Sequence, residues 1–180
     1  MFVTRLLVSM LQFVLNVVIY GFVIYYTYRI FIKANKDFDM EDEIRKGNVA
    51  VGILVGSILL SASMILYRSL ASVSAMIRMF VSSPGEYTLN AFQIGLIAAA
   101  HLGLTMCLAV LTISITLRLF GKMLRPRMRA GKELEKGNIA VGLLLACAVA
   151  VASVYIGDGI GAVSKAMVPQ PSVGQIEVMK

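Results

Sequence analysis

The sequence has few of the residues on which most protein chemistry depends. It contains one histidine, two cysteines and no tryptophan among 180 residues, and only 15% of the residues are charged. Both cysteines, Cys107 and Cys147, lie inside apolar runs, so no disulfide framework is encoded. With 58% hydrophobic residues, the chain is too apolar to bury its surface in one small soluble core. These shortages exclude a disordered protein and a disulfide-stabilised secreted domain, and they indicate a chain whose solvent is lipid.

Four apolar stretches carry this hydrophobicity. They cover about residues 6–32, 48–67, 91–117 and 139–160, and each reaches the roughly 20 residues that cross a hydrocarbon layer. Backbone groups inside a bilayer must be hydrogen-bonded within their own segment, so the stretches predict helices rather than open strands. The first stretch is too long for the apolar region of a signal peptide, and we expect it to be retained. The predicted fold is an all-α integral membrane protein with four transmembrane helices.

Basic residues predict how these helices are oriented. The connections 33–47 and 118–137, taken with Arg29, hold twelve Lys and Arg residues, whereas the opposite side holds five. The positive-inside rule then places both connections in the cytoplasm and both termini outside it. Such loops are attracted to anionic headgroups, and the net charge of +7 therefore indicates topology. No nucleic-acid partner is expected, because no soluble module is present to carry one.

One segment of the chain occurs twice. Residues 43–52, EIRKGNVAVG, reappear as ELEKGNIAVG at 133–142 with seven of ten positions identical, and RIFIK at 29–33 matches RLFGK at 118–122. Chance apolar similarity would not keep Glu, Lys, Gly and Asn in register. The pattern predicts a tandem repeat of a two-helix unit. Because each unit has an even number of spans, the two units should be parallel and related by a pseudo-twofold axis along the membrane normal.

This repeat sets the expected domain boundaries. Residues 1–90 form the first two-helix membrane repeat and residues 91–164 form the second. The serine-rich segment after residue 67 predicts an extension of the second helix to about residue 80, ended by Pro84-Gly85. Residues 165–180 are expected to be a loose C-terminal tail.

The doubled motif, a charged stretch ending in Lys-Gly-Asn-x-Ala-Val-Gly that opens a membrane helix, resembles a known family. Over about residues 6–164 the chain is similar to the YjfL-like bacterial inner-membrane proteins, which carry domain of unknown function 350. The resemblance implies a four-helix bacterial inner-membrane protein with two tandem copies of a two-helix domain. It implies no established activity.

The repeated motif stands at two predicted helix starts on the cytoplasmic side. Its residues are Lys46, Gly47, Asn48, Gly52, Lys136, Gly137, Asn138 and Gly142. Asn is a favoured N-cap, Gly permits a sharp entry, and Lys can extend to the headgroups. In the alternative interpretation, the two helix N-termini form paired anion sites. The Gly52-x3-Gly56 and Gly142-x3-Ala146 spacings predict small faces through which the second and fourth helices pack.

Two sets of polar residues inside or near the membrane are further candidates. Gln12 and Asn16 on the first helix correspond, at an offset of 89, to His101 and Thr105 on the third. They are either interhelical hydrogen-bonding groups or the lining of a water-filled path in which His101 could titrate.

The second set consists of Arg68 and Asp158, which are equivalent at the offset of 90. Each lies 20 residues after its Asn, so both should reach the outer surface. They are predicted to form an ion pair across the axis or, in the alternative, to be two independent interfacial charges.

No motif for catalysis is present. The sequence lacks a His-Glu-x-x-His or Gly-x-Ser-x-Gly motif, and its acidic run at 37–43 lacks the glycine of an EF-hand loop. We therefore expect neither an enzyme nor a bound metal or cofactor. The leading hypothesis is a non-enzymatic scaffold or partner subunit, a homo-oligomer or bound to another membrane or cytoplasmic protein. The alternative is a small channel or transporter lined by the intramembrane polar residues.

The expected topology can be checked by cysteine labelling. In a background lacking Cys107 and Cys147, single cysteines at Asp39 and Arg127 should resist impermeant thiol reagents in intact cells, whereas one at Gln175 should react. The reason is that the bilayer separates the basic connections from the reagent. Labelling at Asp39 without labelling at Gln175 would contradict the predicted orientation.

Overall fold

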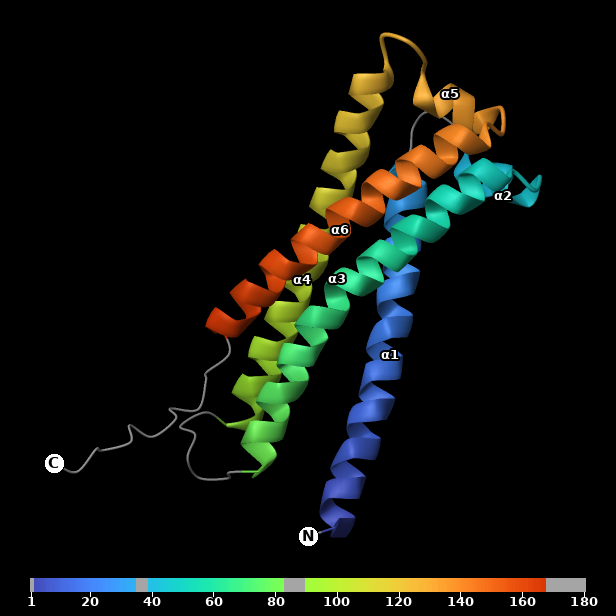
Figure 1. Ribbon diagram of the computed structural model, residues 1–180. Coiled ribbons are helices and arrows are strands. Elements are labelled where there is room, and N and C mark those ends of the chain that lie inside the picture. Colours follow the sequence, from blue (N-terminus) through green and yellow to red (C-terminus); the bar gives the residue numbers. More distant parts are fainter. Residues whose placement is uncertain (1, 35–38, 83–89, 168–180) are drawn as a thin grey trace, which may run out of the picture.

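The computed structural model describes residues 2–34, 39–82 and 90–167, and its regular structure there is entirely helical (Figure 1). Four helices are long and apolar enough to cross a membrane. These are α1 (Phe2–Ala34), α3 (Val49–Ser82), α4 (Ala91–Leu124) and α6 (Ile139–Met167). The predicted all-α fold with four spans is confirmed, and the chain is a multi-pass membrane protein.

All four long helices continue beyond the predicted bounds, α1 by four residues at its start and two at its end. α4 extends past Arg118 to Leu124, although the apolar run ends at residue 117. Arg, Lys, Leu and Met are all good helix formers, so the helix persists where hydropathy falls. α6 reaches Met167 and thus includes the start of the predicted tail, whereas the rest of that tail lies outside the described residues. α3 runs to Ser82, and Pro84-Gly85 also lies outside the described residues.

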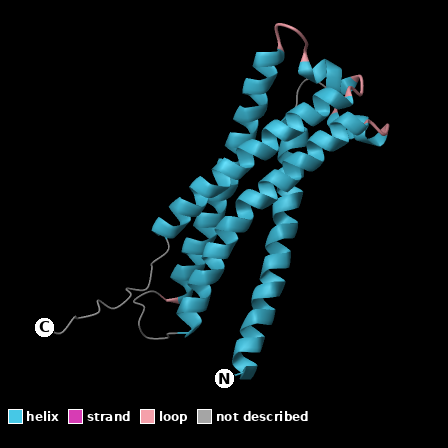
Figure 2. Cartoon of the chain, viewed as in Figure 1, coloured by secondary structure: helices cyan, strands magenta, loops and turns pink. Residues whose placement is uncertain are grey.

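Two short helices were missed by the sequence analysis. α2 (Met40–Arg45) and α5 (Ala130–Glu135) have six residues each and precede α3 and α6 (Figure 2). In α2, the Asp39 carboxylate caps the start by accepting from the backbone N–H groups of Glu41 and Asp42. Their charge made both segments resemble plain loops. We call the end of the bundle that carries them the α2–α5 end.

α3 is the central helix of the bundle. It packs along α6 and also contacts α4 and α1 (Figure 1). Its side chains Leu54, Ile58 and Ile65 are fully buried, together with Ile113 of α4 and Val149 of α6. α1, in contrast, exposes most of its large apolar side chains, as expected for a helix that faces lipid.

The α3 and α6 backbones approach each other closely at Gly142. A Cβ added there would lie 2.6 Å from the Ala50 carbonyl oxygen, so only glycine fits. One turn later, the Ser57 hydroxyl donates to the Ala146 carbonyl oxygen over 2.8 Å. The α6 half of the expected small-residue contact is therefore present.

The α3 half of that expectation is wrong. A Cβ at Gly52 or Gly56 would have no atom within 4 Å, so these glycines do not form the contact with α6. Ala50 and Ser57 take their place. Gly52 lies two residues from Ala50 and therefore about 200° around the helix. The sequence equivalence of Gly52 and Gly142 does not extend to their packing.

This difference predicts opposite effects of one substitution at equivalent positions. Gly142→Ala should lower the free energy of unfolding by about 1–3 kcal/mol, because the added methyl group overpacks the α3–α6 contact. Gly52→Ala and Gly56→Ala should be neutral or stabilise by up to about 1 kcal/mol, because Ala has the higher helix propensity. Unfolding in detergent measures all three, and equal destabilisation by the three variants would contradict the packing.

Candidate functional site

The first Lys-Gly-Asn motif forms a tight turn between α2 and α3. Gly47 has φ +81°, a left-handed conformation that strongly favours glycine. Its N–H donates to the Ile44 carbonyl oxygen at 3.0 Å, and the Asn48 N–H donates to the Glu43 carbonyl oxygen at 2.9 Å. These two hydrogen bonds define a Schellman motif. The glycine is therefore required by the backbone, as its position in the motif indicated.

The second motif has the same backbone geometry. Gly137 has φ +80°, and its N–H donates to the Leu134 carbonyl oxygen at 2.9 Å. The Asn138 N–H donates to the Glu133 carbonyl oxygen, also at 2.9 Å. The seven identities between the two segments thus correspond to one local structure formed twice.

Side chains complete each turn in the same way. The Asn48 Oδ1 accepts from the Val51 N–H at 3.3 Å, while its Nδ2 donates to the Glu43 carboxylate at 2.9 Å. Lys46 Nζ lies 2.9 Å from Glu43 Oε1 and 2.7 Å from Asp42 Oδ2. Hydrogen bonds from Asn48 and Lys46 hold the pKa of the Glu43 carboxyl group below its usual value. Lys46 is therefore bonded to carboxylates and not extended toward headgroups.

In the second copy, Asn138 and Lys136 bond to Glu133 in the same manner, at 3.1 and 3.0 Å. The hydrogen bond from Asn138 is the main cause of the lowered pKa of Glu133. In each copy the lysine ammonium group and the asparagine amide both donate hydrogen bonds to the carboxylate of the same glutamate. This arrangement supports the capping interpretation of the motif over the paired anion sites.

The two copies differ in one contact across the molecule. Asn48 Nδ2 also lies 2.8 Å from the Leu134 carbonyl oxygen and 3.2 Å from that of Glu135. These carbonyls lie at the end of α5, and that of Leu134 already accepts from the Gly137 N–H, so Asn48 is a second donor to it. The Asn138 amide bonds within its own motif. Asn48 thus both caps α3 and attaches α5 to it.

The polar residues of the long helices are only partly brought together. His101 and Thr105 are buried on α4, and the Thr105 hydroxyl lies 3.0 Å from the Ser69 hydroxyl of α3 and 2.9 Å from the His101 carbonyl oxygen. Gln12 and Asn16 are half-buried on α1. The hydrogen bonds of Thr105 therefore lead to α3, which supports interhelical bonding for this residue. Ser69 was missed because nothing distinguishes it from its neighbouring serines.

Arg68 and Asp158 lie together farther along α3 and α6, before the last turns of these helices. Arg68 Nη1 is 2.7 Å from Asp158 Oδ1, with the two side chains 49% and 60% exposed. The Arg68 side chain lies over Gly157, where an added Cβ would be 3.4 Å from its Nε. The cross-helix ion pair, one of the two alternatives from the sequence, is thus present.

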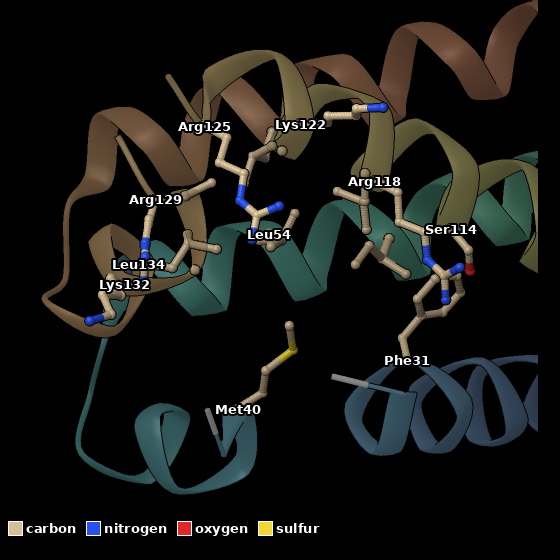
Figure 3. Close-up of a pocket in the computed structure, with 16 residues that line it drawn as sticks. Phe31, Met40, Leu54, Ser114, Arg118, Lys122, Arg125, Arg129, Lys132 and Leu134 are labelled. Atoms are coloured by element: carbon tan, nitrogen blue, oxygen red, sulfur yellow. The ribbon is translucent and has the colours of Figure 1, made fainter. Parts of the chain in front are cut away.

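A cavity at the α2–α5 end was not found from the sequence. It has a volume of about 730 Å³ and is lined from all six helices. Its apolar part includes Phe31, Met40, Leu54, Ile58 and Leu145, and its basic part consists of Arg118, Lys122, Arg125, Arg129 and Lys132. In Figure 3, the Arg125 guanidinium projects toward Leu54, and that of Arg118 lies beside Phe31 and Ser114. The sequence feature that could have indicated this cavity is the spacing of the basic residues 118, 122 and 125, which places three cations on one helix face.

Comparison with known families identifies the chain. The model of a family described as Domain of Unknown Function (DUF350) matches residues 2–160. The chain belongs to the DUF350 family. No curated protein and no solved structure matches it significantly.

The described part of this DUF350 protein offers structural and binding groups. Over those residues, no cluster of three or more His, Cys, Asp or Glu side chains could hold a metal ion. Its polar groups form helix caps, an interhelical hydroxyl contact, a cross-helix ion pair and the basic part of the cavity. The caps fix how the backbone enters the membrane helices, whereas the cavity offers positive charge beside an apolar surface.

Replacing each motif asparagine in turn should separate the stability that helix capping contributes from the stability that the bonds to α5 contribute. Asn138→Ala removes an N-cap and should cost about 1 kcal/mol of unfolding free energy. Asn48→Ala also removes the bonds to α5, so it should cost at least about 1 kcal/mol more. Unfolding in detergent provides the measurement. Equal costs would show that the bonds from Asn48 to α5 contribute nothing.

The ion pair can be tested by charge reversal in this DUF350 protein. Arg68→Asp and Asp158→Arg should each destabilise, because each places two like charges side by side. The double exchange should recover much of the loss, so the coupling energy of the cycle should be clearly greater than zero. Unfolding of the four proteins in detergent closes the cycle, and a coupling energy of zero would indicate independent charges.

Proposed function

We propose that this DUF350 protein is a non-enzymatic scaffold, a partner subunit of a membrane complex that presents a fixed charged surface beside the bilayer. The observation that carries this proposal is the set of hydrogen bonds from Asn48 to the end of α5. They attach the second short helix to the start of α3, so that α2 and α5 have a defined relative position. A partner can recognise a fixed surface without the entropy cost of ordering loops.

The charges on this surface favour a protein partner. α2 exposes the acids Glu41 and Asp42, whereas the segment before α5 exposes Arg125, Arg127 and Arg129. Adjacent regions of opposite sign give orientation and specificity to an encounter. The basic residues also support the proposed location of the α2–α5 end in the cytoplasm of a bacterial cell, with both termini outside.

The hydroxyl contact between α3 and α4 favours this proposal over a channel or transporter. Thr105 and Ser69 are buried and bonded to each other, as expected of groups that hold two membrane helices together. A water-filled path would leave such groups facing water. The apolar surface of α1 offers a second interface, and we propose that it packs against another copy or another subunit.

Site-specific photo-crosslinking in cells tests the scaffold. A photoreactive residue at Glu41 or Arg127 should give a discrete adduct with one protein, whereas one at Tyr155, an exposed α6 side chain, should not. Asn48→Ala should weaken the adduct from Arg127, because α5 loses its attachment, and Asn138→Ala should leave it unchanged.

The channel alternative is decided by flux. Proteoliposomes containing the purified protein should pass no K⁺, Na⁺ or protons above the level of empty vesicles. The scaffold proposal would be wrong if the protein gave a flux that His101→Ala abolishes and no adducts formed at Glu41 and Arg127. Those results would indicate a channel or transporter.

A further inference from the structure

The cavity at the α2–α5 end is lined by apolar side chains and by cations, and the two kinds of side chain follow each other along the helices. Its deepest α3 residue, Ile58, lies ten residues and therefore about 15 Å along the helix from Asn48. Ser114 and Leu117 of α4 line the same deep part. The cations begin at Arg118 of α4 and continue to Arg125, the residue that follows the helix. The deep part of the cavity is thus apolar, and the cations lie toward its surface end together with Met40 and Leu134. A phospholipid has the same sequence of acyl chain, phosphate and headgroup.

The cations that line the cavity have no carboxylate to neutralise them among its described lining residues. Two acids of the α2–α5 end are already bonded, because Asp39 caps α2 and Glu133 accepts from Lys136 and Asn138. Arg118 and Lys122 are one turn apart, and like charges at that spacing repel each other. An anion bound between α4 and α5 would relieve this repulsion.

We infer that this cavity binds one anionic phospholipid molecule from the adjoining leaflet. The Arg118 and Arg125 guanidinium groups and Lys122 would hold the phosphate, since guanidinium donors match two phosphate oxygens at once. Among the apolar lining residues, Phe31 and the half-buried Leu117 would contact the upper part of the acyl chains. A volume of about 730 Å³ lies within the roughly 300–1,000 Å³ typical of ligand pockets. This site differs from the general attraction of basic loops to headgroups, because it needs particular side chains and free space.

The chain provides variants that separate these two requirements. Arg125→Gln removes a cation that projects into the cavity, whereas Arg127→Gln removes an exposed cation from the same loop that is not a lining residue. Gly121→Leu removes space without changing charge. Gly121 lines the cavity, and an added Cβ would have no atom within 4 Å, so the helix accepts the larger side chain.

Native mass spectrometry of the full chain, titrated in detergent with phosphatidylglycerol or with phosphatidylcholine of the same acyl chains, measures the site. We expect one phosphatidylglycerol per chain, bound at least about tenfold more tightly than phosphatidylcholine. Arg125→Gln and Gly121→Leu should each weaken that binding by about tenfold, and Arg127→Gln should leave it unchanged. Circular dichroism and gel filtration verify that each variant folds, and Arg118→Gln replaces any that does not.

Three outcomes would overturn the inference. Equal losses from Arg125→Gln and Arg127→Gln would indicate diffuse attraction, and equal binding of phosphatidylcholine would remove the role of charge. Displacement of the lipid by millimolar inorganic phosphate would identify a site for a free anion and not for a lipid. The scaffold proposal is tested separately, because its adducts are measured at Glu41 and Arg127, outside the cavity.

Discussion

The arrangement of the whole bundle depends on one point of backbone contact between α3 and α6. Where Gly142 lies against Ala50, no side chain separates the two helices, because a Cβ would be 2.6 Å from the Ala50 carbonyl oxygen. Dispersion forces fall off steeply with distance, and in lipid they must replace the hydrophobic effect as the force between helices. α3 also contacts α1 and α4, so the α3–α6 contact sets the frame on which the other two long helices pack.

The same contact determines what happens at the α2–α5 end. Since α3 and α6 start side by side, the end of α5 comes within hydrogen-bonding distance of Asn48. α4 then has to reach α5 through the segment that follows Leu124, and its basic last turns line the cavity together with residues of α3 and α5. The cavity and its cations are therefore a consequence of how the two central helices begin.

Much of this fold could be predicted from the sequence because its signals are local. The spans follow from runs of apolar residues, and the turns occur at Gly47 and Gly137, because glycine permits the left-handed backbone that each turn requires. Even Arg68 and Asp158, opposite charges at matching distances from Asn48 and Asn138, indicated a pair across the helices.

The rest depends on how each helix is rotated about its own axis. Gly52 and Gly142 are equivalent in sequence, but only Gly142 faces the other backbone. The bonds from Asn48 to α5, the Ser69–Thr105 contact and the cavity all require side chains from separate helices to meet. A pattern within one helix does not define that rotation, because apolar residues surround the whole helix in a membrane segment.

The separation of Ala50 and Gly142 along the chain has a consequence for biogenesis. About 90 residues lie between them, so at about 5–20 residues per second α3 waits roughly 5–20 s for α6 to be synthesised. During that interval the Ser57 hydroxyl lacks the Ala146 carbonyl oxygen that it bonds in the finished bundle. The Ser69 hydroxyl lacks its partner for a shorter time, because Thr105 is synthesised before Ala146. The nascent membrane protein therefore passes through a stage in which α3 is held by α1 and α4 alone, and its α6-facing side is available to other membrane helices.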